Sequence, residues 1–230
     1  MSTKRTAAGE DLHPDEDDAA LRAEIDRELA AERAARPRAP QRLTGLVLLI
    51  GGIIGWIASL ELLVGKEYLL ANPGASLGCD VNPFISCGSV MMTWQAAALG
   101  IPNMAIGLGG FAIMAAAGAL MVSRTPLPTW FRWAVLGGML FALAYVHFLA
   151  ISAIFVIRAL CPWCMVVWAV SAPMFFATLA HMVESGDIPV PRALGTLLRR
   201  WVLLTLLWYL LVIVVIAVAF WGQWLATFGL

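Results

Sequence analysis

Charged side chains are scarce in this sequence. Only 13% of its 230 residues are Asp, Glu, Lys or Arg, whereas 61% are hydrophobic. A soluble globular domain has roughly 25% charged residues and about half apolar ones. The scarcity of charge therefore excludes an ordinary soluble domain and predicts that lipid surrounds most of the chain.

The N-terminal segment, by contrast, has few large apolar residues. Residues 1–42 hold ten of the fifteen acids and eight of the fifteen bases in the chain. A segment this polar cannot bury enough surface to fold by itself. We expect a disordered or partly helical tail without chemistry of its own, with a short helix over residues 15–36. No small-residue cleavage pattern follows the first apolar run, so that run is not interpreted as a removable signal peptide.

Long apolar runs make up most of the remaining chain. A transmembrane helix needs about 20 mainly apolar residues. Windows of this length occur at residues 44–65, 101–122, 130–157, 161–182 and 201–221. The loop between the first two windows, residues 66–100, is rich in Gly, Pro, Asn and Ser but also carries large apolar side chains. We therefore expect an all-α polytopic membrane protein in which this loop folds back as a lid, with a short helix over residues 90–99.

Lysine and arginine are almost absent from one side of the predicted bundle. If the tail lies inside, thirteen of the fifteen basic residues fall in inner segments, and only Lys66 and Arg158 fall in outer ones. Cytoplasmic segments of membrane proteins carry the excess of Lys and Arg. The distribution predicts a cytoplasmic N-terminus. It also places the 66–100 loop, the connection between the third and fourth spans, and the C-terminus outside.

The chain has only four cysteines, and all of them fall on the predicted outer side. They form two groups, Cys79 with Cys87 in the loop and Cys161 with Cys164 at the start of the fourth span. Disulfides form and persist in exported compartments, whereas cytosolic thiols stay reduced. Two cysteine pairs in this location indicate disulfide chemistry.

The second pair belongs to the motif Cys161-Pro162-Trp163-Cys164 at the start of an apolar helix. Unpaired amides and the positive dipole end of a helix favour a thiolate over a thiol. Proline suits a first helical turn because it lacks an amide hydrogen that would have no partner there. This setting can lower the pKa of a cysteine from about 8.5 by one to several units, which is typical of a redox disulfide. The loop pair, with seven residues between its two cysteines, can close a disulfide and also move toward a partner.

Two other roles for these cysteines compete with thiol exchange. The pairs could be static disulfides that staple an exported loop. They could also bind zinc, but structural zinc sites prefer Cys-x2–4-Cys spacing, and none of the three histidines falls on the predicted outer face. Thiol exchange explains the arrangement best, and we expect no metal.

The four cysteines and two polar residues form an ordered set along the chain. The set consists of Cys79, Cys87 after seven intervening residues, Thr93 six positions later, Asn103 near the start of the second span, and Cys161-Pro-Trp-Cys164 at the start of the fourth. Over residues 44–182 the sequence thereby resembles the bacterial homologues of vitamin K epoxide reductase. The resemblance implies a four-helix bundle around a quinone, covered by a half-helix on the outer face. Bacterial members of the family often carry a fifth span, as this sequence does.

The resemblance also implies an order of electron transfer among the cysteines. Cys79 and Cys87 would accept electrons from an exported thioredoxin-like oxidase of the DsbA type. Cys87 would pass them to Cys161 through a transient mixed disulfide. Cys164 would then reduce the quinone, either menaquinone or ubiquinone. Epoxide reduction is not implied for this sequence.

Other residues have family roles and also simpler alternatives. Thr93 would support a quinone oxygen or the nearby thiolate, and Asn103 would donate a hydrogen bond to a quinone carbonyl. Each could instead cap a helix or satisfy a backbone carbonyl. Trp168 stands where the animal enzymes place a tyrosine, seven residues after the first cysteine of the Cys-x-x-Cys motif. It is a candidate for stacking on the quinone or for plain packing. His147, in the middle of the third span, could relay protons or be a neutral structural histidine.

The predicted function is that of a membrane thiol–disulfide oxidoreductase supporting disulfide formation in exported proteins. We expect it in a bacterial cytoplasmic membrane, with a catalytic domain at residues 43–183. Residues 184–230 would form an inner loop, the fifth span and a short outer C-terminus. Many family members carry a fused thioredoxin domain, but this sequence stops at Leu230, so we expect a separate DsbA-like partner and no nucleic acid.

Two other functions compete with this one. A DsbB-like oxidase also connects thiols to quinone, but it usually carries its Cys-x-x-Cys motif in the first outer loop. A non-catalytic scaffold or transporter subunit could hold outer structural disulfides. A transporter would show polar groups or broken helices at mid-membrane in paired positions, and this sequence has little there besides His147.

Overall fold

The computed structural model describes residues 14–35 and 39–228. The chain divides into two compact units, residues 1–36 and 37–230. The first unit contains helix α1, Pro14–Ala35, which is rich in charged residues. Every α1 side chain whose exposure is described is exposed, which fits a helix without an apolar core of its own.

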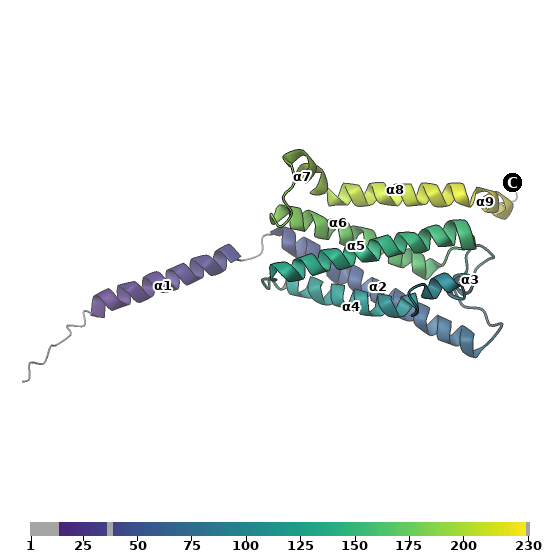
Figure 1. Ribbon diagram of the computed structural model, residues 1–230, viewed down its shortest axis with the longest axis horizontal. Coiled ribbons are helices and arrows are strands. Elements are labelled where there is room, and N and C mark those ends of the chain that lie inside the picture. Colours follow the sequence, from purple (N-terminus) through teal and green to yellow (C-terminus); the bar gives the residue numbers. More distant parts are fainter. Residues whose placement is uncertain (1–13, 36–38, 229–230) are drawn as a thin grey trace, which may run out of the picture. The chain divides into compact units, whose positions relative to one another are not determined.

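The second unit contains five helices that are long and apolar enough to cross a membrane. They lie side by side in Figure 1. They are α2 (Ala39–Ala71), α4 (Asn103–Val122), α5 (Thr129–Ile151) with its continuation η2 (Ser152–Ile157), α6 (Pro162–Glu184) and α8 (Trp201–Ala219). The described residues contain no β-strand, only two isolated β-bridges. The predicted all-α polytopic membrane fold with five spans is confirmed.

The bundle core depends on close approach of α2 and α4. A Cβ atom added to Gly52 would lie 2.6 Å from the backbone nitrogen of Ala115, so only glycine fits there. Small residues at such crossings let transmembrane helices pack tightly without a hydrophobic driving force. Next to this contact, Leu48, Phe111 and Met174 form a buried cluster that joins α2, α4 and α6.

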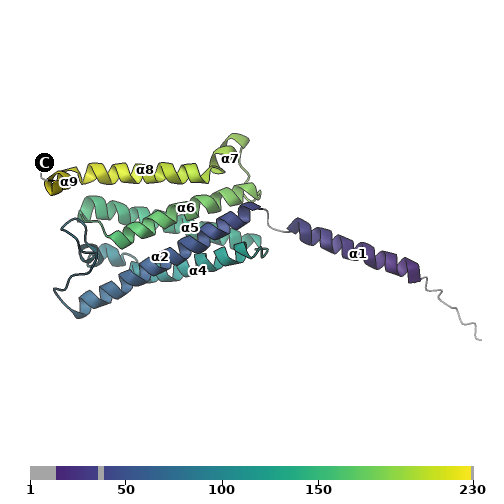
Figure 2. The same cartoon turned by 180° about the vertical axis from the view of Figure 1, so that it is seen from behind.

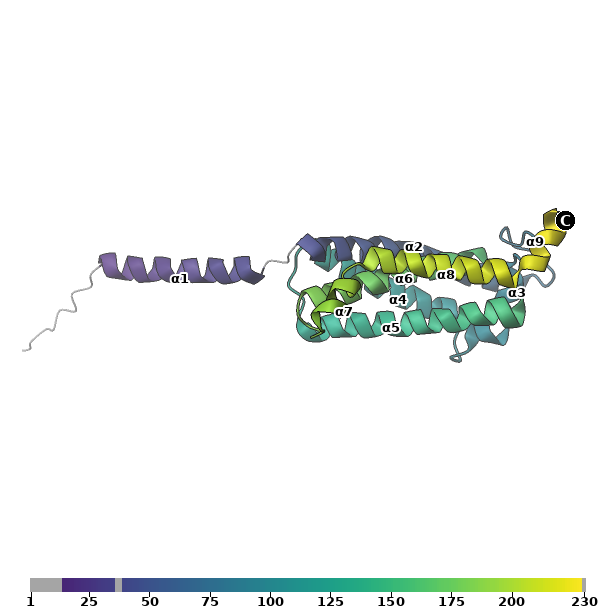
Figure 3. The ribbon, with the colours of Figure 1, turned by 90° about the horizontal axis from the view of Figure 1, so that it is seen from above.

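The lid differs in detail from the single helix expected over residues 90–99. It consists of two short helices, α3 (Cys87–Met91) and η1 (Trp94–Ala97). The first begins early because the Ser86 hydroxyl accepts a hydrogen bond from the Ser89 amide at 3.1 Å and caps it. It is interrupted because Thr93 adopts an extended backbone, with φ −83° and ψ 159°. Figure 3 shows α3 at one end of the bundle and α7 (Arg192–Leu198) at the other.

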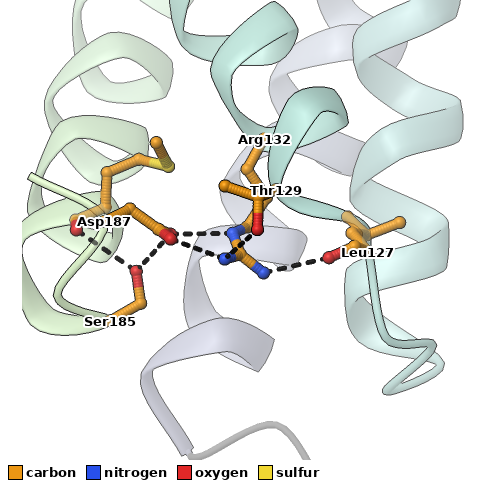
Figure 4. Close-up of polar contacts among 6 residues, drawn as sticks. Leu127, Thr129, Arg132, Ser185 and Asp187 are labelled. Carbon is orange, nitrogen blue, oxygen red and sulfur yellow. Dashed lines mark hydrogen bonds and ion pairs between the residues drawn. The ribbon is translucent and has the colours of Figure 1, made fainter.

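An ion pair closes the end of the bundle away from the lid. The Arg132 guanidinium donates to both carboxylate oxygens of Asp187, at 2.7 and 2.6 Å, and the Ser185 hydroxyl donates to the same carboxylate at 2.7 Å (Figure 4). The Arg132 hydrogen bond holds the pKa of Asp187 below its usual range, although partial burial opposes this. The start of α5 is thereby tied to the loop that follows α6.

The fifth long helix flanks the other four, as Figure 2 shows, and most of its surface remains exposed in the isolated chain. A short helix, α9 (Trp221–Phe228), follows it at the lid end of the bundle. The Tyr209 hydroxyl donates to the Ala169 carbonyl at 2.6 Å and connects α8 to α6.

Candidate active site

A short backbone pairing joins the cysteine loop to the segment before α6. The Leu160 amide donates to the Phe84 carbonyl at 2.8 Å, and the Ser86 amide donates to the Leu160 carbonyl at 2.9 Å. Ile85 and Leu160 thus form an isolated parallel bridge. The two segments, about 75 residues apart in the chain, are held in fixed register.

This register brings the two cysteine pairs together. Cys87 and Cys161 are both completely buried and belong to one apolar cluster, against which Cys79 and Cys164 also pack. Cys79 and Cys87 are joined by a disulfide with an S–S distance of 2.02 Å. Cys161 and Cys164 are free thiols. All four cysteines that the sequence singled out therefore meet at the lid end of the bundle.

Asp80, which the sequence analysis did not single out, fixes the backbone around the loop disulfide. One of its oxygens accepts from the Gly88 amide at 3.0 Å and the Ser86 hydroxyl at 2.8 Å, and the other accepts from the Leu77 amide at 2.8 Å. Burial acts to raise the pKa of this carboxyl, but the hydrogen bonds outweigh it and hold the pKa below its ordinary value. The carboxylate thus holds the backbone on both sides of the Cys79–Cys87 disulfide in place.

Cys161 has the features of an activated thiol. It occupies the position before the first turn of α6, with Pro162 as the first helical residue. A hydrogen bond with the Cys164 side chain lowers the pKa of Cys161, and the Cys164 and Trp163 amides add to this effect against the opposing effect of burial. The direction is the one that the Cys-x-x-Cys motif at a helix start predicts.

A cavity of about 390 Å³ lies beside the Cys-x-x-Cys pair, and both Cys161 and Cys164 line it. Its walls come from α2, the lid, α4, α5, η2 and α6, and they are mostly apolar. Its size lies within the usual range of about 300–1,000 Å³ for small-molecule sites. Thr93, Asn103 and Trp168 all line this cavity.

Asn103 and Thr93 combine the two roles that the sequence analysis contrasted. The Asn103 amide donates to the Gln95 carbonyl at 2.6 Å, and the Thr93 hydroxyl donates to the Val90 carbonyl at 2.8 Å. Each therefore satisfies a backbone carbonyl while facing the cavity. An asparagine amide retains a second N–H for a ligand, whereas a hydroxyl that has given its hydrogen to a carbonyl can only accept.

Tyr145 is a cavity residue that the sequence analysis missed. Its hydroxyl donates to Oδ1 of Asn103 at 2.6 Å, and its ring stacks near Phe141 and Phe148. The bond fixes which way the Asn103 amide faces. No sequence signal marks this tyrosine, since it lies within a long, mainly apolar span.

Trp168 is only 4% exposed and serves both as cavity wall and as part of a buried cluster with Val146 and Leu160. Its placement is thus compatible with stacking on a ligand and with plain packing.

His147 is not one of the described residues that line the cavity. It has two hydrogen-bond partners within the protein. Its Nδ1 contacts the Leu143 carbonyl at 2.7 Å, and the Trp208 indole donates to its Nε2 at 2.9 Å. An indole can only donate, so Nε2 must accept and Nδ1 must carry the single hydrogen. This arrangement favours the neutral structural histidine over the proton relay, and it connects α5 to α8.

The end of the fifth helix is also connected to the site. Arg158, two residues before Leu160, donates to the Ala219 carbonyl at 2.9 Å and lies over the Phe220 ring at 5.3 Å. The Phe84 ring lies 6.3 Å from the same phenylalanine. Both partners of the backbone pairing therefore rest against the end of α8.

A helical membrane bundle that brings two cysteine pairs together, with a cavity beside one of them, defines a membrane thiol–disulfide oxidoreductase. The sequence profile of the Vitamin K epoxide reductase family matches residues 46–179, more than half of the chain, and the protein belongs to this family. The matched region includes all four cysteines and every cavity residue named above. No curated protein matches the chain.

Proposed function

We propose that this protein reoxidises an exported thioredoxin-like thiol protein of the DsbA type and passes the electrons through its two cysteine pairs to a membrane quinone. The observation that carries the proposal is the burial of Cys87 and Cys161 in one cluster beside a cavity lined by Cys164. In a bacterial cytoplasmic membrane, with the N-terminus inside, the lid end would face the exported compartment. The protein would thereby support disulfide formation in exported proteins.

The proposed relay begins at the loop disulfide. A thiolate of the partner attacks the Cys79–Cys87 bond and forms a mixed disulfide. The partner's second thiol breaks that bond, so the partner leaves oxidised and both loop cysteines are left reduced. Two electrons and two protons have then moved from the partner to the loop.

The next exchange takes place between the loop and the Cys-x-x-Cys pair in its oxidised form. The Cys87 thiolate attacks the sulfur of Cys161, so a Cys87–Cys161 bond forms and the Cys161–Cys164 bond breaks. Cys79 then attacks Cys87 and releases Cys161. A thiol with a lowered pKa leaves readily, which suits Cys161 to this step.

The cavity residues fit a quinone ring. Mostly apolar walls suit the ring, Asn103 retains an N–H that could meet a carbonyl, and Tyr145 holds that amide in orientation. Trp168 would contact the ring face, and Thr93 could accept from a hydroxyl. When bound, menaquinone or ubiquinone would supply the acceptor for two electrons and two protons.

Quinone reduction by the purified full chain tests the proposal, with either a reduced thioredoxin-like protein or dithiothreitol as donor. We expect Cys161→Ser and Cys164→Ser to abolish activity with both donors. Cys79→Ser and Cys87→Ser should abolish it only with the protein donor, because the small dithiol can reduce the Cys-x-x-Cys pair directly. Ser123→Ala, a change at the far end of α4, is the matched control and should behave as wild type. Full activity of Cys164→Ser would refute the proposal.

A further inference from the structure

The polar groups of the cavity wall are almost all occupied by the protein itself. Ser59 and Ser171 donate to the carbonyls four residues earlier in their own helices, at 2.8 and 2.7 Å. Thr93 donates to Val90, and Asn103 and Tyr145 are bonded to each other. Each of these side chains is held in place by a protein partner.

Gln95 is the exception. It is only 6% exposed, lines the cavity, and its Oε1 is fully buried without a hydrogen-bond partner among the described residues. One other described buried side-chain atom, His181 Nδ1, shares this lack, but His181 is not part of the cavity wall. An unpaired buried polar group costs roughly 1–3 kcal/mol. Gln95 is therefore the cavity-wall residue, among those described, whose buried carboxamide oxygen lacks a hydrogen-bond partner.

Gln95 lies beside Asn103 at the polar edge of the cavity. Its own backbone carbonyl accepts the Asn103 amide at 2.6 Å, so the two residues are adjacent. Asn103 is held on both sides, by the Gln95 carbonyl and by the Tyr145 hydroxyl, so its carboxamide keeps one orientation and the N–H that it retains can only donate. A carboxamide that no protein partner holds can present either its N–H or its oxygen.

Resting on the proposed function, we propose that Gln95 is a second quinone-headgroup contact, and that it serves both redox states of the ring. Its Nε2–H donates to a carbonyl of the oxidised ring. After the ring has taken up two electrons and two protons, the same carboxamide turns, and Oε1 accepts from the new hydroxyl. The contact would keep both forms seated while Asn103 favours the oxidised one.

Binding measurements can separate this role from a merely structural one. Gln95→Met keeps the length of the side chain but removes its hydrogen bonds. It is placed in the full chain carrying Cys161→Ser and Cys164→Ser, so that no electrons pass during the titration. The ligands are 2,3-dimethyl-1,4-naphthoquinone, its hydroquinone, and 2,3-dimethylnaphthalene, which has the same shape without oxygens. Tryptophan-fluorescence quenching gives the three dissociation constants.

We expect Gln95→Met to weaken binding of the quinone and the hydroquinone by about three- to tenfold each, the effect of one lost hydrogen bond. Binding of the hydrocarbon should be unchanged. Equal weakening of all three ligands would show a structural role and overturn the inference, as would unchanged binding of both oxygenated ligands. Failure of the Gln95-containing parent to bind either oxygenated ring would instead remove the quinone site proposed above.

Discussion

Ser86 and Leu160 are hydrogen bonded through their backbones at 2.9 Å, and each immediately precedes a cysteine, Cys87 and Cys161. Electron transfer by thiol exchange requires direct contact between sulfurs, because a bond forms between them. The backbone pairing of Ser86 with Leu160 therefore aligns two cysteines from distant parts of the chain. The alignment rests on main-chain atoms, so most substitutions of these side chains would preserve it.

A change that removes a main-chain donor should break the alignment. Leu160→Pro deletes the N–H that binds the Phe84 carbonyl. We expect quinone reduction with the protein donor to fall about tenfold or more, because the loop pair would no longer meet Cys161. Activity with dithiothreitol, which bypasses the loop, should fall much less.

Leu160→Ala is the control for this prediction, since it keeps the amide and removes only the side chain. It should retain more activity with the protein donor than the proline variant does. Equal loss with both donors in Leu160→Pro would indicate general misfolding rather than lost register.

The order of the cysteine loop should depend on pH through Asp80. Its pKa is lowered in the folded state, so its stabilising effect is fully present above the unfolded value of about 3.9 and is lost as the pH falls through the lower folded value. After reduction of the disulfide, Cys87 should become more accessible to an alkylating reagent in Asp80→Asn than in wild type at pH 7. Mass spectrometry of the alkylated chain measures the rates.

Asp187→Asn provides the comparison, because it also removes a hydrogen-bonded carboxylate but lies at the far end of the bundle. It should leave the alkylation rate of Cys87 unchanged while weakening the attachment of Arg132. If the Asp80 variant reacts no faster than the Asp187 variant, the carboxylate does not hold the loop.

Tyr145 should act as a positioning residue for quinone binding. Tyr145→Phe removes the hydroxyl that orients the Asn103 amide but keeps the ring stacking. We expect the KM for quinone to rise about three- to tenfold, the equivalent of one hydrogen bond, with little change in kcat. Tyr209→Phe also removes a hydroxyl bonded at 2.6 Å, yet it lies between α6 and α8 and should leave the KM unaltered.

The glycine-lined side of the cavity offers a further test. Gly110 lines the cavity, and a Cβ atom added there would meet nothing within 4 Å. Gly110→Leu should therefore fold normally but project into the space for the ring, and the KM for quinone should rise at least tenfold. Gly109 has equally open surroundings but is not part of the cavity wall, so Gly109→Leu should behave as wild type. Similar KM values for the two variants would place the quinone elsewhere.

The five spans could be predicted from the sequence because each depends on a local property, a run of about 20 mainly apolar residues, which the hydrocarbon of the bilayer requires. The two cysteine groups could also be assigned to one end of the bundle, since an antiparallel order of spans fixes which loops share a side. The bounds of the two lid helices were harder to predict. They depend on the Ser86 cap and on the extended backbone at Thr93, which no periodicity reveals.

The polar contacts of the site depend on tertiary structure and were largely hidden. Tyr145 and Gln95 can be recognised as site residues only from their contacts with Asn103, which lies on a different helix. Asp80 directly follows a cysteine in the sequence, but the groups that donate hydrogen bonds to it become its neighbours only after the loop folds. For His147, the sequence left two roles open, and the Trp208 contact from α8 favours the structural one.

The attachment of α8 has a consequence for anyone who wishes to reduce this protein to a minimal enzyme. The four helices that surround the cavity look separable, but cutting the chain before Trp201 would remove the indole that binds His147 and the carbonyl that binds Arg158. Nε2 of His147, in the middle of its span, would then face hydrocarbon without a partner, which lipid penalises heavily. Arg158, at the outer end of its span, would lose its hydrogen bond to the end of α8. A shortened version would need an apolar replacement at position 147 before it could be expected to assemble.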